Sequence, residues 1–184
     1  MTYNELIEQA RRQLGPVWNE LEVNVAACVK QALAQMAYKV MRDDDIRPLL
    51  QQDYTITLDS NGEGNLLAAI GTITGDAGEI LQGGVKFGVV KDADGNVLKP
   101  IEHYNQFIAP QYPQVGYYCL AAQKILTRAI NIPVTGPLDI VGAPGPLTIR
   151  ASFQPFAVED VPQEIEDLLV QTLCSILAPI NADS

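Results

Sequence analysis

The first 14 residues form an amphipathic pattern that carries helix signals at both ends. Thr2 followed by Glu5 has the spacing of a capping box, in which each side chain bonds the other residue's backbone N–H. Gly15-Pro16 ends the pattern, because glycine closes helices readily and proline cannot continue one. The sequence therefore predicts a short helix over Tyr3–Leu14.

A second, longer helix is predicted from Val17 to Arg42. A single apolar stripe runs along it, with members at intervals of three and four: Trp18, Leu21, Val25, Val29, Leu33, Met36 and Val40. Asp43–Asp45 follows, and negative charge at the C-terminal end of a helix opposes the helix dipole. We expect a loop to start there.

After this loop the spacing of apolar residues changes to two, which indicates strands. Tyr54–Leu58 is rich in β-branched residues and is predicted to be a strand. Asp59–Asn65 has the composition of a turn, and Leu66–Ile70 follows as either a partner strand or an irregular run. Gly71–Gly84 contains five glycines and is predicted to be a connecting loop.

A hairpin gives the strongest strand signal in the chain. Val85–Val90 and Val97–Ile101 are apolar segments that flank Lys91–Asn96. The Asp-Gly pair in this connection supplies the positive-φ residue that a tight hairpin turn needs. A second pair of strands is predicted at Gly116–Ala121 and Lys124–Arg128.

Three further segments complete the β-rich part of the chain. Glu102–Ala109 is predicted to hold one or two helical turns, which prolines stop. Ile132–Pro146 holds four prolines and three glycines, which is typical of an extended, turn-rich arm or loop. Leu147–Phe153 alternates apolar and polar residues and is predicted to be the last strand.

A closing helix is predicted after these strands. Asp160 caps it in this prediction, with Gln163 three residues on, and Pro179 stops it. Its buried stripe is formed by Ile165, Leu168, Leu169, Leu173, Ile176 and Leu177.

This element order predicts an α+β fold in a single domain, residues 1–184. The N-terminal helices and the C-terminal helix are expected to pack as a bundle around residues 1–50 and 158–178. A central antiparallel β-hairpin region is expected over residues 51–157, with the Pro/Gly-rich arm or loop at 132–146.

Composition restricts the function classes. Apolar residues make up 47% of the 184 residues and charged residues 18%, which is typical of a chain that buries a core. With 12 basic and 22 acidic residues the net charge is -10, which disfavours non-specific binding of nucleic acid. No apolar run reaches the roughly 18 residues of a membrane span, and the N-terminus lacks the apolar stretch of a signal peptide.

Few residues offer catalytic or metal-binding chemistry. The three cysteines, Cys28, Cys119 and Cys174, are far apart and indicate a reducing compartment, with neither a disulfide framework nor a zinc site. His103 is the single histidine, which excludes a two-histidine metal site. The composition therefore favours a scaffold or binding protein, for which we expect no cofactor, no metal and no enzymatic activity.

Several short motifs have an ordinary structural reading. Asp92–Asn96 resembles a calcium loop only superficially, because Gly95 comes too early for an EF-hand, and we interpret it as a solvated hairpin turn. Asp43–Asp45 is interpreted as a solvated loop in preference to a cation site. Gly62–Gly64 and Gly142–Gly145 lack the lysine and Ser/Thr of a phosphate-binding loop. His103 is expected to be structural.

Two apolar features favour contacts with other molecules. Aromatic residues cluster along the chain at Tyr104, Phe107, Tyr112, Tyr117 and Tyr118. A stacking platform for single-stranded nucleic acid is one interpretation, but only Lys99 and Lys124 lie nearby, so we prefer a core or a protein interface. The arm at 132–146 carries Leu138, Ile140 and Val141, and either folds back on its own chain or docks on a neighbouring subunit.

The element order resembles that of the head-to-tail adaptor (connector, neck) proteins of tailed bacteriophages. The amphipathic N-terminal helices with Trp18, the hairpin Val89–Ile101 and the following Tyr104-Asn-Gln-Phe107 carry this resemblance. The Tyr117-Tyr118 strand with its partner Lys124–Arg128, and Phe153–Pro162 leading into the closing helix, complete it. The residue pattern that runs from the hairpin through the tyrosine strand to the closing helix covers about Tyr54 to Ala178, and Gly71–Gly84 has no counterpart in the resemblance.

The resemblance implies a structural virion protein without a catalytic site. Such adaptors form homo-oligomeric rings, commonly twelve-fold, in the neck of the virion, where they join the portal protein to the tail or other neck proteins. They continue the channel through which DNA passes, and an acidic protein repels phosphate there. Assembly in the cytoplasm of a host bacterium agrees with the reduced cysteines.

Two alternatives remain open. One is another virion structural protein, such as a tail-completion protein or a capsid-associated ring protein. The other is a small hydrolase that uses His103 with an acid such as Glu102, which predicts a deep pocket around the histidine.

Overall fold

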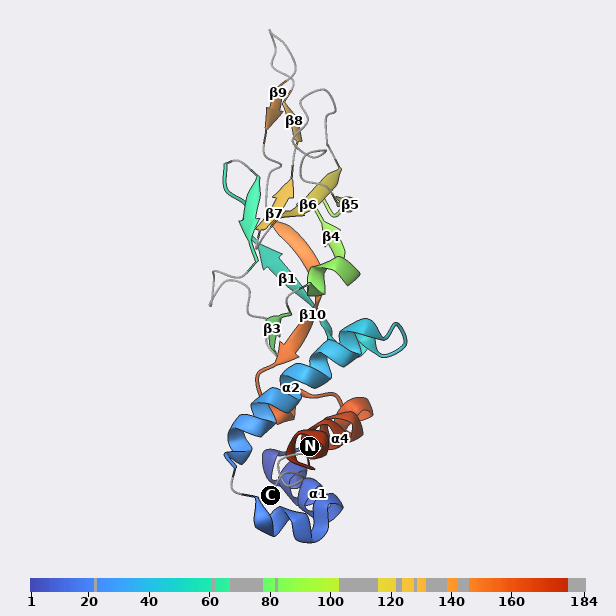
Figure 1. Ribbon diagram of the computed structural model, residues 1–184. Helices are drawn as coiled ribbons and strands as arrows, with labels where there is room; N and C mark the ends of the chain where they lie inside the picture. Colours follow the sequence, from blue (N-terminus) through green and yellow to red (C-terminus); the bar gives the residue numbers. More distant parts are fainter. Residues whose placement is uncertain are drawn as a thin grey trace. The chain divides into compact units, whose positions relative to one another are not determined.

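The computed structural model describes residues 1–21, 23–60, 62–66, 78–81, 83–102, 116–121, 124–127, 129–131, 139–141 and 146–178. The chain divides into two compact units. We call Met1–Gln51, Asp76–Leu81 and Ser152–Ser184 the helical unit, and Gln52–Gly75 and Gln82–Ala151 the sheet unit. Each unit therefore takes residues from distant parts of the sequence, and the fold class is α+β (Figure 1).

The helical unit contains α-helices, short 3-10 helices and one short strand. Its elements are α1 (Tyr3–Leu14), η1 (Gly15–Glu20), α2 (Val25–Arg42), η2 (Arg47–Leu50), β3 (Gly78–Ile80), η4 (Val158–Asp160), η5 (Gln163–Ile165) and α4 (Glu166–Leu177). β3 pairs antiparallel with the last residues of β10 (Leu147–Pro155), which places Phe153 opposite Ile80.

The structure confirms the short helix and its capping box. The Thr2 hydroxyl oxygen accepts the Glu5 backbone N–H at 3.3 Å, and a Glu5 carboxylate oxygen accepts the Thr2 N–H at 2.7 Å. Gly15 ends α1 with a φ of 57°, a left-handed conformation that glycine adopts without strain.

The predicted start of the second helix is wrong. Residues 15–20 form the 3-10 helix η1, and α2 begins only at Val25. Asn24 explains the delay, because its side-chain oxygen accepts the Ala27 N–H at 3.2 Å and caps the helix there. Trp18 and Leu21 therefore lie outside α2. The predicted end at Arg42 is confirmed, and Asp43–Asp45 begins a turn as expected.

Helix α4 packs on both α1 and α2 and forms the centre of the helical unit (Figure 1). Its buried residues follow the predicted stripe only in part, because Leu168 and Ile176 are half buried. The buried residues of α4 are Leu169, Val170, Thr172, Leu173 and Leu177. The predicted cap is wrong. Asp160 instead accepts the Ala157 N–H at 3.0 Å, and η5 intervenes before α4 starts at Glu166.

The sheet unit is built from short strands around an apolar core. The strands are β1 (Gln51–Ile56), β2 (Glu63–Asn65), β4 (Val89–Lys91), β5 (Val97–Ile101), β6 (Tyr117–Ala121), β7 (Lys124–Thr127), β8 (Ala129–Asn131), β9 (Asp139–Val141) and the first part of β10. Their order in the sheet is β1-β10-β4-β5-β6-β7-β2, while β8 and β9 form a separate two-stranded ladder.

The sheet is mixed, which corrects the expected antiparallel hairpin region. Both predicted hairpins exist, since β4 pairs antiparallel with β5 and β6 with β7. β5 and β6, however, run parallel, with Lys99 opposite Tyr117. A parallel pair needs a long connection between its strands, and the 15 residues between Ile101 and Tyr117 serve as one.

Several predicted boundaries shift. The first strand lies at Gln51–Ile56 instead of Tyr54–Leu58, and β2 falls inside the expected turn Asp59–Asn65. The expected strand Val85–Val90 begins as the 3-10 helix η3 (Gly84–Phe87) and becomes extended only at Val89. Gly83 permits this, because it precedes η3 in a left-handed conformation, with a φ of 81°, that glycine adopts without strain.

Two expected loops contain strands. The expected loop Gly71–Gly84 includes β3, while residues 71–77 and 82 lie outside the described residues. The arm at 132–146 includes β9, which pairs antiparallel with β8 so that Ile140 lies opposite Ile130. Leu138 lies outside the described residues.

The strands β1 and β2, which stand at the two ends of the sheet order, approach each other at Gly64. A Cβ added to this β2 residue would lie 2.6 Å from Cγ2 of Ile56 and 3.0 Å from Cγ2 of Ile125. Ile56 belongs to β1 and Ile125 to β7, so the sheet curls and leaves no room for a side chain at position 64. The glycine therefore permits close packing between strands at opposite ends of the order.

Candidate functional site

The outward surface of four strands combines exposed apolar and basic residues. Burial alternates along β1, β10, β4 and β5, so that one face is buried and the other is open to solvent. We call the solvent-facing set the outer sheet face: Asp53, Val89, Lys91, Val97, Lys99, Thr148 and Arg150. Opposite it, Tyr54, Val90, Leu98 and Ile149 are buried.

Strand register places these residues in rows across the sheet. Thr148 on β10 lies opposite Lys91 on β4, and Lys91 lies opposite Val97 on β5. In the next row, Arg150 lies opposite Val89. The two valines are 41% and 60% exposed, at positions 89 and 97 respectively. Two apolar side chains are therefore exposed to solvent on a face that also carries Lys91, Lys99 and Arg150.

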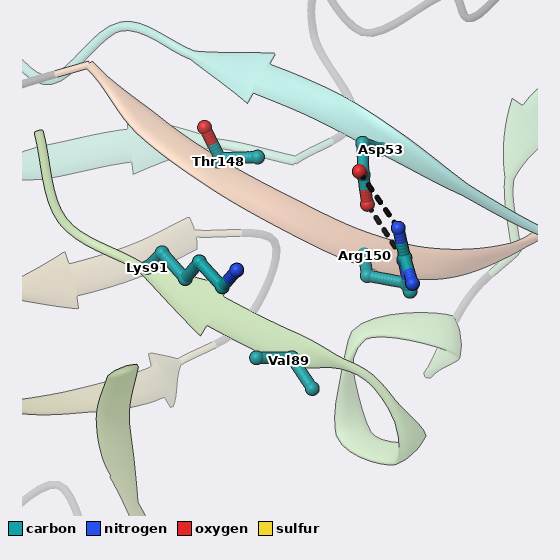
Figure 2. A pocket seen from close by; sticks show the side chains of 5 residues that line it. All are labelled: Asp53, Val89, Lys91, Thr148 and Arg150. Atoms are coloured by element: carbon teal, nitrogen blue, oxygen red, sulfur yellow. Dashed lines mark hydrogen bonds and ion pairs between the residues drawn. The ribbon is translucent and has the colours of Figure 1, made fainter. Parts of the chain in front are cut away.

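An ion pair fixes one edge of this face. Arg150 donates from Nε to Asp53 Oδ1 at 2.8 Å and from Nη2 to Asp53 Oδ2 at 2.9 Å, which joins β10 to β1 (Figure 2). The hydrogen bonds from Arg150 lower the pKa of Asp53, and the charges of Arg150 and Lys91 lower it further. The same hydrogen bonds raise the pKa of Arg150. This pair keeps the guanidinium extended along the sheet surface.

A hollow of about 160 Å³ lies on the part of this face that β1, β10 and β4 form. It is lined by Asp53, Val89, Lys91, Thr148 and Arg150, as Figure 2 shows. The carboxylate of Asp53 is engaged by Arg150, and no general base stands beside the Thr148 hydroxyl among these residues. The arrangement suits binding of an apolar or anionic group and lacks the parts of a nucleophilic site.

A second hollow of about 520 Å³ lies on the sheet unit near β5 and β6. Lys86, Pro100, Ile101, Glu102, Tyr118 and Leu120 line it. Tyr118 is buried, which raises the pKa of its phenol, and Tyr117 is half buried. These two members of the aromatic cluster therefore belong to the packed sheet, as preferred from the sequence. Tyr104, Phe107 and Tyr112 lie outside the described residues.

The Asp92–Asn96 segment is a hairpin turn, as interpreted from the sequence. The Asp92 carboxylate accepts the backbone N–H groups of Asp94 at 3.0 Å and of Asn96 at 2.8 Å. Burial works to raise the pKa of this carboxyl, but hydrogen bonds from Asn96, Asp94 and Gly95 outweigh it and lower the pKa. The carboxylate thus stabilises the turn that sets Lys91 opposite Val97.

The other candidates do not form a site among the described residues. Asp43 accepts the Asp45 N–H at 3.0 Å, and Asp44 pairs with Arg47, so this run is an organised turn. Within the described part of the chain, no three His, Cys, Asp or Glu side chains are placed to hold a metal ion. His103 and Gly142–Gly145 lie outside the described residues, and Glu102 is exposed.

The cysteines are free thiols. Cys28 and Cys119 are buried and Cys174 is half buried. Burial raises the pKa of the Cys119 and Cys174 thiols, which favours the protonated, unreactive form. None of the helices in the described part of the chain has the length and apolar content needed to span a bilayer.

Charge is divided unequally between the two units. The helical unit holds 15 acidic and six basic residues, a net charge of -9, whereas the sheet unit holds seven and six, a net charge of -1. This difference in charge could not be seen along the sequence, because the helical unit combines segments from both ends of the chain. The alternation of apolar and polar residues in Leu147–Phe153 predicts that Arg150 faces outward, but no pattern in the sequence predicts that Asp53 is its partner.

Compared with models of known protein families and with curated proteins, the sequence matches none of them.

Proposed function

We propose that this chain is a structural protein of the neck of a tailed bacteriophage, where copies form a ring that joins the portal protein to the tail. The proposal starts from the resemblance of the element order to head-to-tail adaptors. The observation that carries it is the outer sheet face, with Val89 and Val97 exposed in register with Lys91 and Arg150.

A face of this kind suits contact between proteins. Burying apolar side chains in an interface stabilises it by about 25 cal/mol per Å² of apolar area removed from water. Surrounding charges then select the partner and fix its orientation. The face has no grouping of nucleophile and base around its hollow, so its chemistry supports binding in preference to a reaction.

The finer parts of the proposal concern assembly and DNA. The three helices act together as the rigid bundle of each subunit, the ring is about twelve-fold as in similar adaptors, and its partners are further copies, the portal protein and tail or other neck proteins. Assembly takes place in the bacterial cytoplasm. The net charge of -10 disfavours phosphate binding, so DNA passes through the channel without being held.

The test is to locate the chain in the assembled virion. Labelling with an antibody, or cryo-electron microscopy of intact particles, is expected to place it between portal and tail in a symmetric ring. A purified portal protein is expected to retain the chain on a column. Density in the capsid shell or at the tail tip would instead support another virion structural protein, and a chain absent from the particle would contradict the proposal.

A further inference from the structure

The described residues of each unit expose large apolar side chains in opposite electrostatic surroundings. Phe87, Val89 and Val97 are exposed on the sheet unit, and Tyr3 and Phe156 on the helical unit. Val89 and Val97 lie in register with Arg150 and Lys91, whereas the helical unit has a net charge of -9. Two separate surfaces on one chain are therefore complementary in sign.

We propose that the outer sheet face of one copy binds the helical unit of a second copy, at a surface formed by Tyr3, Glu5, Phe156 and Glu159. We call this second set the acidic aromatic surface. The inference rests on the proposed ring, and it names the two patches through which neighbouring subunits join.

The outer sheet face supplies the basic half. Lys91, Lys99 and Arg150 are exposed, and only Asp53 carries a negative charge on the face. Because Asp53 is engaged by Arg150, the ammonium groups of Lys91 and Lys99 remain available to a partner's carboxylates. Val97, at 60% exposed, stands beside Lys91 and supplies apolar area that an aromatic ring can cover.

Hydrogen bonds hold the acidic aromatic surface in place. A Glu159 carboxylate oxygen accepts the Tyr3 backbone N–H at 2.9 Å, so the start of α1 is fixed beside η4. Glu5 is held by the Thr2 backbone at 2.7 Å. Backbone hydrogen bonds lower the pKa of both Glu5 and Glu159, so both carry charge at neutral pH. Phe156, half exposed, lies three residues before Glu159.

The sign of the charges selects the geometry of assembly. Two outer sheet faces would repel each other, because each carries a net positive charge, and two helical units would repel for the opposite reason. Contact between unlike patches is heterologous, so a pair of subunits leaves one patch of each kind free for further copies. Repetition of such a contact closes into a ring when the rotation between neighbours permits it.

The first test compares two charge reversals of equal size. Lys91→Glu lies on the outer sheet face, and Lys30→Glu lies on the exposed side of α2, outside both patches. We expect the wild type to self-associate at low salt and to dissociate as salt is raised, measured by sedimentation velocity. Lys91→Glu is expected to weaken association by at least about tenfold. Lys30→Glu is expected to behave as the wild type.

Circular dichroism and an unchanged unfolding midpoint would establish that Lys91→Glu is folded. A wild type that stays monomeric at low salt and at the highest soluble concentration overturns the inference. So does a folded Lys91→Glu variant that associates as the wild type does, or a Lys30→Glu variant that loses association equally.

The second test uses a complementary pair. Phe156→Lys puts an ammonium group on the acidic aromatic surface without emptying a buried position. Alone it is expected to associate weakly, as Lys91→Glu does. A mixture of the two variants is expected to recover association. The unaltered acidic aromatic surface of Lys91→Glu can bind the unaltered outer sheet face of Phe156→Lys, and at the next contact the new carboxylate faces the new ammonium group. Failure of the folded variants to complement each other contradicts the pairing of these patches.

The two proposals can fail separately. If Lys91→Glu abolishes self-association but the wild type is absent from the virion neck, the interface stands and the proposed function falls. If the chain occupies the neck while folded Lys91→Glu still forms the ring, the function stands and the interface falls.

Discussion

Arg150 and Asp53 form two parallel hydrogen bonds, of 2.8 and 2.9 Å, although 97 positions separate them in the sequence. The pair links β10 to β1, a strand at one end of the sheet order (Figure 2). Both side chains are about half exposed, at 57% and 50%, so the contribution to stability is screened by solvent. Its main effect is to orient the guanidinium on the outer sheet face.

Replacing Asp53 should change how stability depends on pH. The folded state lowers the pKa of Asp53, so the ion pair stabilises the fold above the unfolded pKa of about 3.9 and is lost as the pH falls through the lower folded pKa. We expect Asp53→Asn to be slightly less stable than the wild type at pH 7, with the difference shrinking toward pH 2. Urea unfolding at both pH values measures it, and an equal loss at both would contradict this assignment.

Gly88→Ala should be severely destabilising. A Cβ at position 88 would overlap the backbone carbonyl of Arg150, which cannot move without separating β4 from β10. We expect a loss of about 3 kcal/mol or more, at the upper end of overpacking effects. Gly64→Ala serves as the comparison, because its added Cβ meets the methyl ends of Ile56, Leu58 and Ile125. Denaturant unfolding should show the smaller loss for Gly64→Ala.

The hairpin turn should discriminate between substitutions at Gly95. This residue has a φ of 85°, which costs an ordinary L-residue about 1–2 kcal/mol. We expect Gly95→Ala to lose about that much stability and Gly95→Asn to lose less, since asparagine tolerates left-handed conformations. The same denaturant titration checks both, and an equal loss would show that φ is not the cause.

Helix α4 should be the most sensitive helix to truncation of its side chains. Leu173 is fully buried in a helix that packs on both α1 and α2. We expect Leu173→Ala to cost about 2–5 kcal/mol, from lost burial and the cavity left behind. Gln171→Ala is the matched control on the exposed side of the same helix and should change stability little. Thermal unfolding followed by circular dichroism compares the two.

The sequence predicted best where the signal was local. The capping box at Thr2 and Glu5 and the Asp-Gly hairpin turn need only neighbouring residues, and both are present as expected. The start of α2 was missed because the apolar spacing continues from η1 into α2 without a break. The α-helix itself begins only at Val25, where Asn24 caps it. Periodicity alone does not distinguish a 3-10 helix from the first turns of an α-helix.

Features that depend on distant residues were not predicted. The parallel pairing of β5 with β6 leaves no mark in either strand, since each strand also pairs antiparallel with a strand close to it in the sequence, β5 with β4 and β6 with β7. The outer sheet face was missed for the same reason. Val89, Val97 and Arg150 each suit an ordinary strand, and only the register unites them.

Each unit is assembled from segments that are far apart in the sequence, and this has a consequence for biosynthesis. A ribosome releases α1 and α2 long before α4, the helix on which both pack, and it releases β1 long before β10. During translation at about 5–20 residues per second, the early segments must therefore wait several seconds with their apolar stripes uncovered. Nascent chains stalled before residue 147 should bind holdase chaperones strongly, and release should follow once β10 and α4 have emerged.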